Sequence, residues 1–187
     1  MFTHNCDDVL SLVALLGWLG HALACGEHGV DDGLDLAGVG RLWERLDPDR
    51  AAACYRNALA IGLPAPVAHT VRLRLASWEK RQSRWDSARV LWEEAASAKS
   101  FDPRPWEELA KYHEHRARDA ATARALVARA LGRAEAAAAP ASIVDALTYR
   151  LARLDQRLAR PRRILSSSSI FRPAPSAFRA EPTRPRA

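Results

Sequence analysis

A triplet of small, large and small residues recurs along the middle of the chain at a nearly constant interval. Within each triplet the residues are four and three positions apart, so they share one stripe of a helix. A stripe of this kind lets a neighbouring helix approach closely and pack against the large side chain, which predicts stacked pairs of helices. The triplets, which begin 37 and 35 residues apart, are Ala51, Tyr55 and Ala58; Ala88, Trp92 and Ala95; and Ala123, Val127 and Ala130.

The interval and the residues before two of the triplets resemble the tetratricopeptide repeat, a helix pair of about 34 residues. Leu75 and Ala76 precede the second triplet, and Trp106 and Ala110 precede the third, where that repeat carries its other packing residues. The resemblance covers residues 35–134. It implies a TPR-like solenoid of helical hairpins, whose groove binds a protein or peptide.

Helix-starting residues fall where helix pairs require them. Asp47 with Pro48 and Asp102 with Pro103 each supply an N-cap followed by a proline in the first turn. No stretch alternates apolar and polar residues, so we expect no strands and an all-α fold. The predicted helices cover residues 5–26, 35–46, 48–61, 66–82, 85–99, 103–117, 119–134 and 141–160.

The chain divides into four regions by pattern and composition. Leucines spaced by three and four near the C-terminal end of the ordered part predict an amphipathic helix that caps the repeats. The regions are residues 1–30, a closing helix; 35–134, the TPR-like pairs; 141–160, the capping helix; and 161–187, a tail rich in Arg, Pro and Ser that we expect to be disordered.

The excess positive charge of the chain lies in that tail. Residues 160–187 hold seven arginines and one acid, Glu181, which accounts for the whole net charge of +6. Residues 1–159 are formally neutral, with 21 basic and 21 acidic residues. The tail is either a solvated extension or an arm that binds nucleic acid weakly and in a salt-dependent way.

The first turn of the first predicted helix contains His4, Asn5 and Asp8. This start resembles the last motif of bacterial RNase H-like 3′–5′ exonucleases of the DEDD type. The resemblance implies that Asp8 is a ligand to one of two Mg²⁺ or Mn²⁺ ions and that His4 occupies the general-base position. The family's other three carboxylates lie upstream and have no counterpart here. We therefore expect this chain to lack most of the catalytic core and to be inactive by itself, while its parent binds nucleic acid.

A simpler interpretation of the same residues is also open. Asn5 followed three residues later by Asp8 is a capping-box-like helix start, and any helix can begin this way. On this interpretation the chain is a free-standing TPR-like scaffold or adaptor with no nuclease connection.

Five basic residues cluster on one predicted helix and the turn after it. They are Arg72, Arg74, Lys80, Arg81 and Arg84. They are candidates for binding a partner in the groove of the repeats. The alternative is an ordinary solvated helix face.

The segment from Val9 to Gly26 carries no charged residue. Asp7 and Asp8 stand where a signal peptide carries Lys or Arg, and His21 interrupts the apolar run. We therefore expect a buried helix rather than a membrane partner, in a cytoplasmic protein. Three scattered cysteines, Cys6, Cys25 and Cys54, agree with a reducing compartment.

A helix this apolar is expected to associate with other apolar surfaces when no domain covers it. We therefore expect the chain to self-associate through Leu10, Val13, Leu16 and Trp18.

Overall fold

The computed structural model describes residues 2–28 and 30–159, with the backbone alone for residues 2–4 and 27. Every regular element in this part of the chain is a helix, which confirms the expected all-α class. The predicted disordered tail lies outside the described residues. The elements are α1 (Phe2–Cys25), η1 (Gly26–His28), α2 (Gly33–Trp43), α3 (Pro48–Ile61), α4 (Ala65–Arg81), α5 (Trp85–Ala96), α6 (Pro103–Lys111), η2 (Tyr112–Arg116), α7 (Ala120–Ala136) and α8 (Ala141–Ala159).

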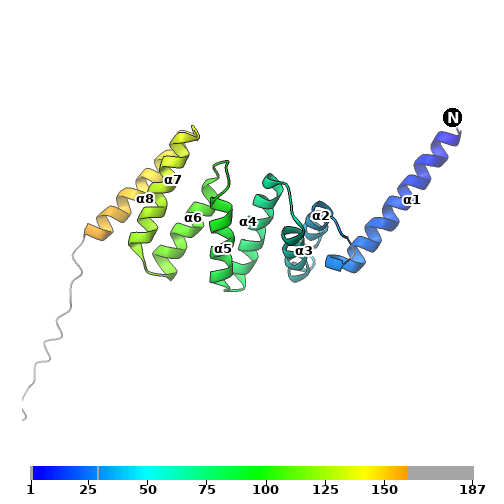
Figure 1. Ribbon diagram of the computed structural model, residues 1–187, viewed down its shortest axis with the longest axis horizontal. Helices are drawn as coiled ribbons and strands as arrows, with labels where there is room; N and C mark the ends of the chain where they lie inside the picture. Colours follow the sequence, from blue (N-terminus) through cyan, green and yellow to red (C-terminus); the bar gives the residue numbers. More distant parts are fainter. Residues whose placement is uncertain (1, 29, 160–187) are drawn as a thin grey trace, which may run out of the picture.

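Helices α2 to α8 lie side by side in a row, and α1 extends away from one end of it (Figure 1). From α2 onward, each helix packs against the next one along the chain. Helices α3 and α6 begin at capped positions, because Asp47 and Asp102 accept backbone N–H groups from Arg50 and Arg104 as the sequence predicts. The fold is therefore built from local contacts, and its core runs along the row instead of gathering at one centre.

The repeated triplets form the interfaces between the helices. All nine residues are between 0% and 3% exposed, so the prediction that they are packing residues is confirmed. One cluster joins α2, α3 and α4 around Tyr55, and a second joins α4 to α8 around Trp92 and Val127.

The helix predicted at residues 103–117 is not an α-helix over its whole length. It is α-helical up to Lys111 and continues as the π-helix η2. The wider π turn accommodates one extra residue, because Ala76 and Ala110 are 34 positions apart whereas Glu79 and Glu114 are 35 apart. Both alanines and both glutamates are buried, so Glu114 remains buried, as Glu79 is, despite the longer spacing.

Two glycines of α2 provide a matched test of this close packing. A Cβ on Gly40 would lie 2.7 Å from the Tyr55 ring, whereas a Cβ on Gly38 would meet nothing within 4 Å. We expect Gly40→Ala to lower the free energy of unfolding by about 1–3 kcal/mol, because the ring has to shift. Gly38→Ala should raise it by about 0.5–1 kcal/mol through helix propensity. Urea denaturation of both variants checks this, and an equal effect of the two would contradict the packing.

The expectation that the first helix is buried is wrong for this structure. Seven large apolar residues between Val9 and Trp18 are 45–66% exposed. Only the C-terminal end of α1 packs on the row, where Ala22 contacts Val39 and Cys54. Over the described residues, Asn5–Cys25 is the one helix long and apolar enough to cross a membrane, by length and composition alone.

The junction between α1 and the row has a defined geometry. Gly26 ends the helix with a positive φ of 57°, which favours glycine. The Arg50 guanidinium donates a hydrogen bond of 2.5 Å to the Ala24 carbonyl and stacks 4.5 Å from the centre of the Trp43 ring. A cation therefore caps the negative end of the α1 dipole.

Candidate binding groove

A groove made of two adjacent cavities runs along α4 and α6. It consists of two cavities, of about 1020 Å³ between α2, α3, α4 and α6, and about 740 Å³ between α4, α6 and α8. Lys80, Glu107 and Glu108 line both cavities, so the two cavities lie next to each other. The groove is thus long and open, which suits an extended ligand better than a small molecule.

The side chains that line the groove carry more positive than negative charge, although residues 1–159 are neutral overall. Nine basic side chains line it against three carboxylates, those of Glu44, Glu107 and Glu108. This surplus is a property of the fold, because the basic residues come from several separate segments. The nine basic residues are Arg45, Arg74, Lys80, Arg81, Arg104, Lys111, Arg116, Arg150 and Arg153.

Ion pairs between successive helices fix the wall of the groove near its middle. Lys80 of α4 pairs with Glu108 of α6 at 2.5 Å, and Lys111 pairs with the same carboxylate at 2.8 Å. Burial raises the pKa of Glu108, but the hydrogen bonds from Lys111 and Lys80 outweigh it and hold the pKa below its ordinary value. Both ammonium groups are still partly open to solvent, with side chains 40% and 45% exposed. They therefore keep room to bind a ligand carboxylate.

A second bridge ties α2 to α4 at the other end of the groove. Arg74 donates to both carboxylate oxygens of Glu44 at 2.6 Å, and the Tyr55 hydroxyl donates to one of them at 2.5 Å. Burial raises the pKa of Glu44, but these hydrogen bonds outweigh it and lower the pKa. Arg74 is thus held in place by a carboxylate that stays ionised.

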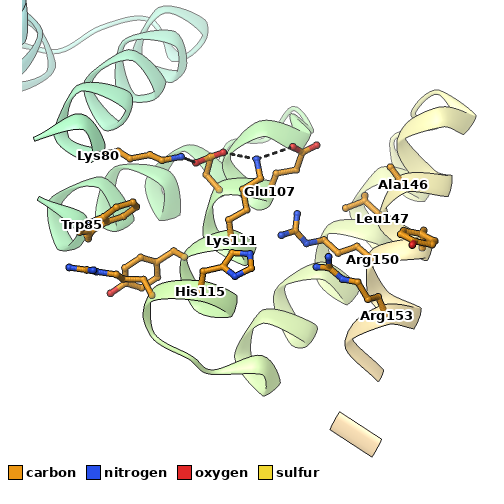
Figure 2. A pocket seen from close by; sticks show the side chains of 13 residues that line it. Lys80, Trp85, Glu107, Lys111, His115, Ala146, Leu147, Arg150 and Arg153 are labelled. Carbon is orange, nitrogen blue, oxygen red and sulfur yellow. Dashed lines mark hydrogen bonds and ion pairs between the residues drawn. The ribbon is translucent and has the colours of Figure 1, made fainter. Parts of the chain in front are cut away.

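The cavity beside α8 combines apolar lining residues with two guanidinium groups. Trp85, Tyr112 and Leu147 contribute to its lining, and Arg150 and Arg153 project into it from α8 (Figure 2). An apolar surface bordered by cations suits an acidic segment that also carries an apolar side chain.

Arg150 and Arg153 share one buried carboxylate. Glu114 is 3% exposed and accepts from Arg150 at 2.7 Å and from Arg153 at 2.5 Å. A buried carboxylate requires such partners, since an unpaired charge in this position is very costly. Glu114 therefore fixes α8, and its two arginines, against η2.

The basic cluster predicted from the sequence divides into two groups. Arg74, Lys80 and Arg81 line the groove. Arg72 instead pairs with Glu94 of α5 at 2.7 Å. Arg84 pairs with the buried Glu79 and stacks 4.1 Å from the Trp78 ring centre. The structure thus brings three of the five together, and their role in binding a partner stays a prediction.

Sequence reasoning missed the basic residues that other repeats supply. Lys111, Arg150 and Arg153 are remote from the predicted cluster along the chain and meet it only when the helices stack. One sequence signal was available: Glu44, Glu79 and Glu114 recur every 35 residues, and each pairs with arginine. Glutamates that recur at the repeat interval therefore indicate positions where a carboxylate holds an arginine in place.

The two residues of the exonuclease-like motif lie on α1, far from the groove. His4 is in the first turns of that helix, and its side chain lies outside the described part of the structure. Asp8 follows one turn later on the exposed part of α1. Among the described residues, no group of three or more His, Cys, Asp or Glu side chains is placed to hold a metal ion.

Asp102 organises the start of α6 and with it Arg104 of the groove. Its carboxylate accepts the Arg104 backbone N–H at 2.9 Å, pairs with the Arg104 side chain at 2.7 Å, and lies 2.6 Å from His69 Nε2 on α4. Burial raises the pKa of Asp102, but the hydrogen bonds from Arg104 and His69 outweigh it and lower the pKa to about 2. Asp102 is therefore held in its ionised form at the N-terminus of α6.

This depressed pKa predicts a pH dependence of stability. Because the folded pKa lies below its usual value of 3.8, the contribution of Asp102 is complete above that value and is lost as the pH falls towards 2. We expect Asp102→Asn to cost about 1 kcal/mol of unfolding free energy at pH 7, because the amide can still cap the helix but loses the charge-assisted bonds to Arg104 and His69. The difference from the parent chain should shrink between pH 4 and pH 2 in urea titrations. A pH-independent difference would contradict the assignment.

Comparison of the chain with protein-family models, curated proteins and solved structures finds no match. The resemblances to an exonuclease motif and to tetratricopeptide repeats therefore stay predictions.

Proposed function

We propose that this chain is a TPR-like interaction module whose groove binds an acidic, extended segment of a partner protein. The observation that carries the proposal is the concentration of nine basic side chains against three carboxylates in one groove of an otherwise neutral body. Complementary charge steers such a partner and fixes its register. The regular stacking of helix pairs and the repeat interval support the TPR-like interpretation.

A peptide fits the groove better than a nucleic acid. Glu107 and Glu108 lie at the middle of the groove, where a continuous phosphate backbone would meet them. A peptide can place its acidic side chains at the basic positions and neutral groups beside the two glutamates. Trp85 and Leu147, on opposite sides of the cavity beside α8, offer apolar surface to an apolar side chain.

Fluorescence anisotropy with three labelled probes tests this function. The first is a 14-residue peptide rich in Glu and Asp with two leucines, the second is its Gln and Asn counterpart, and the third is a 12-nucleotide single-stranded RNA. We expect the acidic peptide to bind at least tenfold more tightly than either of the others at 150 mM salt. Equal binding of the two peptides, or tighter binding of the RNA, would contradict the proposal.

The origin of the module in an exonuclease is a separate proposal, supported by the motif from His4 to Asp8. It holds that the native polypeptide carries an upstream RNase H-like domain that needs Mg²⁺ or Mn²⁺. Mass spectrometry of the native product tests it: upstream peptides containing an Asp-x-Glu motif support it. A native product of 20.6 kDa would favour the free-standing scaffold.

A further inference from the structure

The exposed part of α1 carries a seam of large apolar residues at coiled-coil spacing. Val9, Leu12, Leu16 and Leu19 follow one another by three, four and three positions, so they lie along one face of the helix. The first three are 52%, 59% and 66% exposed. Such a seam packs against another helix, because its knobs need a facing set of holes.

The other residues that the structure describes do not cover this seam. Figure 1 shows α1 pointing away from the row of helices. Its apolar packing on the row is confined to the last turns, where Ala22 and Leu23 join the cluster at Val39 and Cys54. The occupant therefore comes from outside these residues.

The exposed part of α1 is too short to cross a lipid bilayer. Asp7 and Asp8 bound it on one side, and the packed Ala22 bounds it on the other. The 13 residues between, 9–21, span about 20 Å at 1.5 Å per residue. The hydrocarbon core of a membrane is about 30 Å thick, so this stretch is too short to cross it while α1 remains docked on the row.

We propose that α1 of a second copy of this chain covers the seam, with the two helices antiparallel. The seam is symmetric about position 14, so an antiparallel pair sets Val9 against the partner's Leu19 and Leu12 against the partner's Leu16. The matching of large residues along the whole seam is what a twofold axis through position 14 requires.

Charge favours the antiparallel arrangement over the parallel one. A parallel pair brings Asp7 and Asp8 of both copies together, and like charges at close range are destabilising. An antiparallel pair places these acids near the other end of the partner's helix, the end where His21 lies and Arg50 binds the Ala24 carbonyl. The two helix dipoles then also oppose each other favourably.

Sedimentation equilibrium of the full 187-residue chain tests the proposal. We expect a mass of twice 20.6 kDa at 50 μM. Leu12→Glu/Leu16→Glu should weaken dimerisation at least 100-fold and give the monomer mass. Val90→Glu, which alters an exposed apolar residue of α5 away from the seam, should leave the dimer intact. Circular dichroism verifies that the double variant stays helical.

Cysteine pairing tests the orientation, in chains with Cys6→Ser and Cys25→Ser. An equal mixture of Leu12→Cys and Leu16→Cys chains should form a mixed disulfide at least fivefold more often than either chain forms with itself. A monomeric parent chain, dimers that survive the Glu substitutions, or preferential pairing of identical cysteines would each overturn the proposal. Flotation with neutral phosphatidylcholine vesicles tests lipid as the occupant. Binding to the vesicles that depends on Leu12 and Leu16 would assign the seam to lipid and would also overturn the proposal.

Discussion

Replacement of Glu114 by Gln is expected to lower the melting temperature of this chain by about 10 °C. Glu114 is a buried carboxylate held by Arg150 and Arg153, so it joins η2 to α8. Its removal leaves Arg150, whose side chain is only 17% exposed, without its counter-charge. Breaking a buried pair in this way costs about 3–5 kcal/mol, and each kcal/mol corresponds to roughly 2–4 °C in a chain of this size.

The matched control is Glu135→Gln, which removes an exposed carboxylate from α7 and should shift the melting temperature by less than about 2 °C. Because contacts in this fold run between neighbouring helices, hydrogen exchange should show the loss of protection concentrated in α8 and η2. Uniform loss along the row, or no difference from the control, would show that Glu114 does not fasten α8.

The variant Lys80→Glu/Lys111→Glu is expected to weaken binding of the acidic peptide about 100-fold. Both lysines are partly exposed at the middle of the groove and lie beside Glu107 and Glu108. Reversing them replaces two attractions by two repulsions, which amounts to about 3 kcal/mol of binding free energy. Anisotropy titration of the labelled peptide measures the change.

Two further variants separate charge from structural damage. Lys80→Gln/Lys111→Gln avoids the new repulsion with the glutamates and should still weaken binding about tenfold. Lys99→Glu reverses an exposed lysine between α5 and α6 that does not line the groove, and it should bind as the parent does. If Lys99→Glu weakened binding as much as the double variant, net charge rather than the groove would explain the affinity.

The helices were predictable from the sequence because local rules and packing agree. Asp47, Asp102 and Asp119 cap α3, α6 and α7 as their sequence neighbourhoods indicate. The buried triplets follow from the 3.6-residue period together with the need for small residues where helices approach. The π turn η2 was not predicted, because helix propensity does not show how one inserted residue is accommodated.

The groove was only partly predictable, since its residues meet through stacking. Arg74, Lys80 and Arg81 lie on one helix and were visible as a cluster. Arg150 and Arg153 lie on the capping helix, and only the docking of α8 on η2 brings them to the same surface. The exposure of α1 was not predicted either, because an apolar composition does not show whether a partner surface is present in the same chain.

Carbodiimide cross-linking tests the central claim, that the groove holds the acidic segment, most directly. This reagent joins a carboxylate to a lysine amine in contact with it. The chain has three lysines, of which Lys80 and Lys111 line the groove and Lys99 does not. Mass spectrometry of the treated complex should find the peptide on Lys80 and Lys111 and not on Lys99. Cross-links at Lys99 as often as at the other two would contradict binding in the groove.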